Sequence, residues 1–129
     1  MARILVVEDS PTVVSSVEWM LRRNGHEVYI ARDGLTALAS VRALVPEIVL
    51  LDILLPHTNG YEVCALVRKN PAYKSTRVVM MTCLKDEANV KRAYEVGADG
   101  YITKPFQETD LLDTVNKHLT QSNPSVGLS

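Results

Sequence analysis

The chain has 129 residues, a formal net charge of −1 and 47% hydrophobic residues. This length and composition predict one globular domain with a buried core and exclude a disordered chain. The near balance of charges argues against direct nucleic-acid binding, and no apolar run approaches the ~18 residues that would span a membrane. We therefore expect a soluble cytoplasmic domain.

Five short apolar runs are candidate β-strands. In chain order they are Ile4–Val7, Val28–Ala31, Ile48–Leu51, Val78–Met81 and Gly100–Thr103. The first, third and fourth contain only Val, Ile, Leu and Met, as expected for central parallel strands covered on both faces. The second and fifth include polar or small residues, which favours positions nearer the edge of the sheet.

The segments between these runs carry apolar residues at helical spacing. They are Val13, Val17, Met20 and Leu21, then Leu35, Leu38 and Val41, and finally Leu111, Leu112, Val115 and Leu119. Stop signals follow at Asn24-Gly25, Pro46 and Gly97. Alternating strands and helices predict an α/β fold, a doubly wound five-stranded parallel sheet with helices on both faces. The domain is expected over residues 1–119, with residues 120–129 as a flexible tail or linker stub.

The two cysteines, Cys64 and Cys83, form no metal-binding pair and stand in apolar surroundings. We predict that both are core thiols in a reducing compartment.

Reactive side chains follow four of the five predicted strands. Glu8 and Asp9 follow the first, Asp52 the third, Thr82 the fourth and Lys104 the fifth. One acid after a strand is ordinarily a helix cap or a loop residue. Because ligands bind beyond the carboxyl ends of such strands, five positions at one edge indicate a functional site.

The chemistry of this group points to phosphoryl transfer. Three neighbouring carboxylates repel one another, and a hard cation with oxygen ligands, such as Mg²⁺, relieves this repulsion. Asp52 could then act as a nucleophile that forms an acyl phosphate. Lys104 and Thr82 could contact the phosphoryl oxygens.

Five motifs, in order along the chain, resemble those of the receiver domain of two-component response regulators. They are Leu5-Val6-Val7-Glu8-Asp9-Ser10, Leu50-Leu51-Asp52-Ile53-Leu54-Leu55-Pro56, Asn59-Gly60, Met81-Thr82 and Thr103-Lys104-Pro105-Phe106. The resemblance covers about residues 2–119 and is to the stand-alone type, like the chemotaxis receiver. It implies a flavodoxin-like fold with strand order 2-1-3-4-5.

The resemblance implies a role for each acidic residue. Asp52 is the expected phosphoacceptor, receiving phosphate from a histidine kinase, a histidine phosphotransfer protein or a small phosphodonor. Asp9, Asp52 and the backbone carbonyl of Leu54 are the expected Mg²⁺ ligands, and Glu8 is expected to act through a metal-bound water.

The resemblance also implies the residues of the switch. Thr82 is the expected switch hydroxyl, Tyr101 the aromatic side chain that follows it, and Lys104 the partner of the phosphoryl group. The Lys104–Pro105 bond is expected to be cis.

These roles together describe a phosphorylation-dependent switch that catalyses only its own phosphorylation and dephosphorylation and is not otherwise an enzyme. Output is expected through the face of the fourth helix, fifth strand and fifth helix, to a partner protein or to an output domain absent from this sequence. The chain is expected to be a monomer or a phosphorylation-promoted dimer.

Other interpretations of the function remain open at this point. The chain could be a phosphorelay intermediate, or a receiver-like docking module that works without phosphorylation. A nucleotide- or flavin-binding domain is disfavoured because the loop Glu8–Pro11 is acidic and lacks glycine. An aspartyl-phosphate hydrolase is disfavoured because no second Asp stands two residues after Asp9.

Two further features carry expectations. Leu54 and Leu84 are apolar where relatives can carry polar side chains that orient water, which predicts a long-lived acyl phosphate. Trp19 falls opposite the apolar stripe of its helix and is expected to face outward, either as an ordinary surface aromatic or as a partner anchor.

Overall fold

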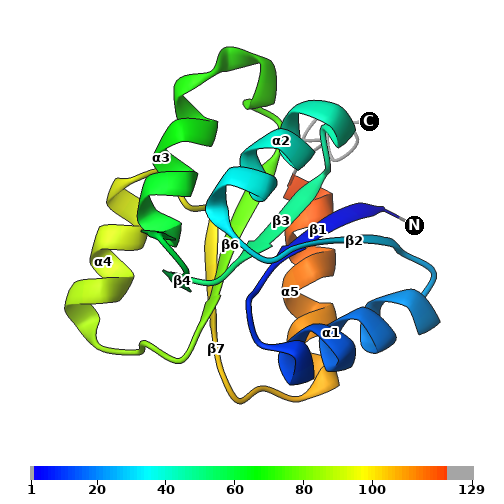
Figure 1. The fold of residues 1–129 in the computed structure, drawn as a ribbon. Helices are drawn as coiled ribbons and strands as arrows, with labels where there is room; N and C mark the ends of the chain where they lie inside the picture. The colour runs from blue at the N-terminus through cyan, green and yellow to red at the C-terminus, as the bar shows by residue number, and fades with distance from the viewer. Residues whose placement is uncertain (1, 122–129) are drawn as a thin grey trace.

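Five parallel strands form the middle layer of the computed structural model, which describes residues 2–121 (Figure 1). They are β1 (Arg3–Val7), β2 (Glu27–Ala31), β3 (Ile48–Leu51), β6 (Arg77–Thr82) and β7 (Gly100–Thr103). Their order is β2-β1-β3-β6-β7. Since β6 and β7 are the fourth and fifth strands of this sheet, the predicted order 2-1-3-4-5 is confirmed. The two mixed runs lie at the edges, as expected.

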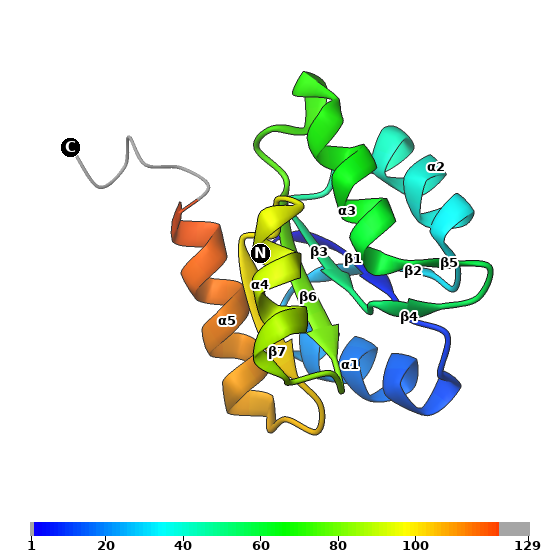
Figure 2. The ribbon, with the colours of Figure 1, turned by 90° about the vertical axis from the view of Figure 1, so that its left-hand side faces the viewer.

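Helices cover both faces of the sheet (Figures 1 and 2). α1 (Pro11–Arg23) and α5 (Glu108–Gln121) lie on one face, whereas α2 (Gly34–Leu44), α3 (Gly60–Lys69) and α4 (Glu87–Glu95) lie on the other. The side chains of Ser10, Asp33, Asn59 and Asp86 cap the amino ends of the first four helices. Gly25 (φ 89°) and Gly97 (φ 106°) follow α1 and α4 in the left-handed conformation that favours glycine, which confirms the stop signals at Asn24-Gly25 and Gly97.

The sheet separates two clusters of buried side chains. Along β1, Leu5 and Val7 pack against α2 and α3, whereas Ile4 and Val6 pack towards α1 and α5. This alternation follows from the two-residue period of a strand. It explains why the central strands are continuously apolar.

One detail of the predicted helix stripes is wrong. In α1 Val13 packs against the core as predicted, although it is only partly buried and Val14 is the fully buried residue of the first turn. In α2 Leu35 is 83% exposed, whereas Val41 is buried and Leu38 packs against the core as predicted, and Gly34 and Ala37 are buried as well. The reason is close packing at the start of α2, where a Cβ on Gly34 would lie 2.4 Å from Thr58 Cγ2.

The prediction that both cysteines are core thiols is correct for Cys64 and wrong for Cys83. Cys64 is buried in α3, and burial raises the pKa of its thiol to about 11. Cys83 is exposed because it follows the last residue of β6, where the chain has left the sheet.

Short elements complete the fold. A two-stranded antiparallel hairpin, β4 (Leu54–Leu55) and β5 (Thr58–Asn59), lies between β3 and α3, and a 3₁₀ turn, η1 (Pro71–Tyr73), follows α3. α5 continues to Gln121, so most of the predicted tail lies outside the described residues. Within residues 2–121, no helix combines the length and apolar character needed to cross a bilayer.

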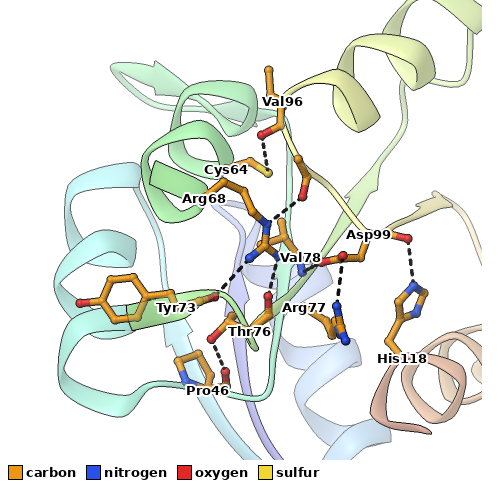
Figure 3. Close-up of polar contacts among 11 residues, drawn as sticks. Pro46, Cys64, Arg68, Tyr73, Thr76, Arg77, Val78, Val96, Asp99 and His118 are labelled. Atoms are coloured by element: carbon orange, nitrogen blue, oxygen red, sulfur yellow. Dashed lines mark hydrogen bonds and ion pairs between the residues drawn. The ribbon is translucent and has the colours of Figure 1, made fainter. Parts of the chain in front are cut away.

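A polar network joins the segments at the amino ends of β6 and β7 (Figure 3). The guanidinium of Arg68 donates to the backbone carbonyls of Gly97 (2.9 Å), Tyr73 (3.2 Å) and Thr76 (2.5 Å) and pairs with the Asp99 carboxylate at 2.7 Å. We refer to these five residues as the Arg68–Asp99 network.

Candidate functional site

The predicted site residues meet at the carboxyl edge of the sheet. Glu8 follows β1, Asp52 follows β3, Thr82 ends β6 and Lys104 follows β7. Glu8, Asp52 and Thr82 are buried. Backbone hydrogen bonds continue the strand pairing into this edge, from Asp52 N–H to Val7 O (3.0 Å) and from Lys104 N–H to Thr82 O (2.8 Å). The end of β3 is therefore held beside the end of β1, and the end of β7 beside the end of β6.

Lys104 joins two of the three carboxylates. Its Nζ lies 2.6 Å from Glu8 Oε1 and 3.1 Å from Asp52 Oδ2. Burial alone would lower the pKa of the Lys104 ammonium, but its hydrogen bonds to Glu8 and Asp52 outweigh burial and raise the pKa above its ordinary value. The amine is thus a fixed positive charge beside Asp52.

The other carboxylate oxygens accept backbone hydrogen bonds. Ser10 N–H donates to Glu8 Oε2 at 3.0 Å, and Leu54 N–H donates to Asp52 Oδ1 at 3.2 Å. Asp9 differs from both because it is exposed. Glu8 is therefore held by protein donors on both oxygens, whereas Asp9 faces solvent.

The donors at this edge suit a hard cation that keeps several water ligands. The expected ligands would offer carboxylate oxygens from Asp9 and Asp52 and a backbone carbonyl from Leu54. Among residues 2–121, no group of three or more His, Cys, Asp and Glu side chains is arranged to enclose a metal. Mg²⁺ ordinarily binds through one or two carboxylates with water and phosphate oxygens, so these residues fit it.

Gly60 allows α3 to begin against the backbone of Asp52. Gly60 N–H donates to Ile53 O at 2.8 Å. A Cβ at Gly60 would lie only 2.4 Å from Asp52 O, a contact that real Cβ atoms essentially never make. The Asn59-Gly60 pair is the sequence signal for this close approach, although its spatial relation to Asp52 could not be derived from spacing alone.

Thr82 and Tyr101 both contact Leu84, in the loop between β6 and α4. Leu84 N–H donates to Thr82 Oγ1 at 3.4 Å, and the Tyr101 hydroxyl donates to Leu84 O at 2.5 Å. Burial raises the pKa of Tyr101 to about 12, so its hydroxyl stays protonated and can donate. The two predicted switch residues are thus joined through one loop residue.

A shallow apolar cavity of about 380 Å³ opens beside Lys104, between α1 and the segment after β7. Its walls include Val13, Met20, Cys83 and Phe106. The Lys104–Pro105 bond in this wall is cis, which confirms the expectation from the resemblance.

Trp19 faces outward from α1, as predicted, and is 59% exposed. The Arg23 guanidinium lies 4.2 Å from the centroid of its ring, and Arg23 is itself paired with Glu108 at the start of α5. These contacts hold an exposed aromatic side chain in a defined position.

One set of contacts near the site was not predicted. Tyr61, the second residue of α3, contacts Asn89 and Arg92 of α4. The sequence offered no signal for this contact, because the two helices are not adjacent along the chain.

Comparisons with known proteins agree along nearly the whole chain. The model of the family described as the response regulator receiver domain matches residues 4–116. Protein PilG of Pseudomonas aeruginosa is 35% identical over 95% of this chain and 90% of its own. The DNA-binding response regulator MtrA of Mycolicibacterium smegmatis is 38% identical over 93% of this chain, which spans about half (51%) of its length.

Solved structures show the same likeness. The chemotaxis protein CheY4 of Vibrio cholerae superposes with a TM-score of 0.86 at 32% identity, covering 91% of this chain and 98% of its own. The receiver domain of the sensor histidine kinase PA1611 of Pseudomonas aeruginosa has a TM-score of 0.85 at 25% identity, covering 92% of this chain and 97% of its own. That structure has a magnesium ion in its active-site cleft.

Proposed function

Because this chain belongs to the response regulator receiver domain family, we propose that it is a signalling switch controlled by phosphorylation of Asp52. The observation that carries the proposal is the convergence of a buried carboxylate, a paired ammonium and a buried hydroxyl at one edge of the sheet. This is the set of groups that accepts a phosphoryl group and then reports its presence.

The chemistry is a transfer to the Asp52 carboxylate. An Asp52 oxygen attacks phosphorus, a bond forms between them, and the bond from phosphorus to the donor histidine nitrogen, or to the leaving oxygen of a small phosphodonor, breaks. Lys104, already 3.1 Å from Asp52 Oδ2, exchanges this contact for one with a phosphoryl oxygen.

Asp9, Asp52 and the Leu54 carbonyl would hold Mg²⁺, with Glu8 acting through a metal-bound water. The ion supplies positive charge that offsets the phosphoryl oxygens and the neighbouring carboxylates. The magnesium ion in the cleft of the PA1611 receiver supports this assignment.

The conformational change that carries the signal begins at Thr82. Its hydroxyl gains a phosphoryl oxygen as a partner and moves towards Asp52, which shifts the loop at Leu84 and the face formed by α4, β7 and α5. The donors are a histidine kinase or a histidine phosphotransfer protein in the cytoplasm. The receiver of the signal is an output protein, or an output domain of a longer chain.

The test is phosphate labelling by acetyl phosphate in the presence of Mg²⁺. Wild-type protein is expected to be labelled, and Asp52→Asn and wild type with EDTA are expected to be unlabelled. Asp113→Asn serves as the matched control because it makes the same chemical change at an exposed position of α5. Equal labelling of wild type and Asp52→Asn would falsify the assignment, and a wild type that takes up no phosphate would leave a docking module instead.

A further inference from the structure

α4 is attached to the rest of the molecule by few apolar contacts. Within α4 (Glu87–Glu95), all of which the structure describes, Ala93 is the only buried residue. The loop from Thr82 to Asp86 leads directly into its first turn. The position of that turn therefore depends on polar contacts.

Tyr61 of α3 supplies these contacts. Its buried side chain donates a hydrogen bond to Asn89 Oδ1, and its hydroxyl also lies 3.3 Å from the backbone oxygen of Asn89. The Arg92 guanidinium lies 4.2 Å from the centroid of the Tyr61 ring. One side chain thus holds two successive turns of α4.

Asn89 passes this restraint to the start of the helix. Asn89 Nδ2 donates to Asp86 Oδ1 at 2.6 Å, and its backbone N–H donates to Asp86 Oδ2 at 3.3 Å. Asp86 is the residue that caps α4. Burial raises the pKa of Tyr61, so the hydroxyl keeps the proton that it donates.

The backbone of Tyr61 is fixed close to Asp52, the proposed phosphoacceptor. Tyr61 follows Gly60, which is pressed against the backbone of Asp52, and Val63, Cys64 and Val67 anchor α3 in the core. Of the two helices that Tyr61 connects, α4 is the one that can move.

We propose that Tyr61 is a latch: a positioning residue that holds the first turn of α4 against α3 in the unphosphorylated protein. The latch rests on the proposed function, because it regulates the same switch. When Thr82 moves towards Asp52 it draws Leu84 with it, and this movement pulls Asp86 and Asn89 away from Tyr61. Tyr61 therefore opposes activation, and phosphorylation has to overcome this restraint.

The test compares Tyr61→Phe with wild type. This change removes one hydroxyl and keeps the ring beneath Arg92. One hydrogen bond of ordinary net strength corresponds to about a fivefold change in a local opening equilibrium. Amide hydrogen exchange within α4 is expected to rise by about this factor, and labelling by acetyl phosphate is expected to become faster. Tyr73→Phe is the matched control, since the Tyr73 hydroxyl makes no hydrogen bond within residues 2–121, and it should change neither rate.

Each outcome decides the proposal. Unchanged exchange in α4 of Tyr61→Phe overturns the latch, and faster exchange with unchanged or slower labelling overturns its role in activation. A merely structural role would slow labelling, not accelerate it. If wild type takes up no phosphate, the proposed function fails while hydrogen exchange still decides whether Tyr61 holds α4.

Discussion

At the scale of single residues, Leu54 is an exposed apolar residue next to Asp52. Its backbone N–H donates to Asp52 Oδ1, and the residue is 54% exposed. Hydrolysis of an acyl phosphate needs a water that is held in line with the bond to be broken. The side chain of Leu54 carries no group that could hydrogen-bond such a water.

We expect Leu54→Glu to shorten the lifetime of phosphorylated Asp52 severalfold, because the new carboxylate can orient the attacking water. The measurement is the loss of label after the phosphodonor is removed. Leu35→Glu is the matched control, since Leu35 is also exposed but lies on α2. An unchanged lifetime in Leu54→Glu would show that the leucine is not what protects the phosphate.

The approach of Glu8, Asp52 and Lys104 was predictable, because parallel strands bring their carboxyl ends to one edge. The details of Glu8 were not, since nothing in the order of residues shows that Ser10 and Lys104 occupy its two oxygens. The prediction that Leu35 lies on the buried side of its helix was wrong for a related reason. Helical spacing identifies a stripe, but close packing at Gly34 determines which way the first turn of the helix faces.

At the scale of elements, α1 presents a surface next to the opening of the site. Trp19 is held by Arg23, and the apolar cavity beside Lys104 lies along the same helix. A fixed, exposed aromatic side chain next to an apolar cavity is typical of a binding hot spot. This geometry favours the anchor interpretation of Trp19.

Trp19→Ala is expected to weaken the interaction with a histidine phosphodonor protein by about tenfold or more, the usual effect at a hot spot. Labelling by acetyl phosphate should be unaffected, because a small donor needs no docking surface. Tyr94→Ala, which removes a 48% exposed aromatic from α4, is the control. If Trp19→Ala transfers phosphate from the protein donor with unchanged affinity and rate, Trp19 is only a surface residue.

The order and bounds of the main elements were largely predictable, since periodicity and stop signals are local properties. The β4–β5 hairpin was not, because its strands are too short to show a pattern. The attachment of α4 was also beyond prediction, since it depends on a contact between Tyr61 and a helix far along the chain.

At the scale of the whole molecule, the carboxyl ends and the amino ends of the parallel strands have different roles. The carboxyl edge carries the reactive groups, and the amino edge carries the Arg68–Asp99 network (Figure 3). Asp99 also accepts Val78 N–H at 2.9 Å, and its backbone oxygen lies 3.2 Å from His118 Nε2. This edge therefore connects α3, β6 and α5 without taking part in the chemistry.

Asp99→Ala is expected to lower the free energy of unfolding by about 2 kcal/mol or more, since it leaves a partly buried guanidinium and a backbone N–H without their acceptor. Urea denaturation measures this loss. Labelling of Asp52 at a temperature where the variant is folded should match wild type. A variant as stable as wild type would contradict the conclusion that the Arg68–Asp99 network stabilises the fold.

The alternation of β1 between two cores has a consequence for insertions and deletions. One residue added within β1 would turn the residues on one side of the insertion to the opposite face of the sheet, so side chains of both cores would be misplaced at once. If the residues after the insertion are the ones that turn, Glu8 would also rotate away from Lys104. Changes of chain length should therefore be tolerated in exposed connections between elements and not within β1, and a library of single-residue insertions should show this as a map of permitted positions.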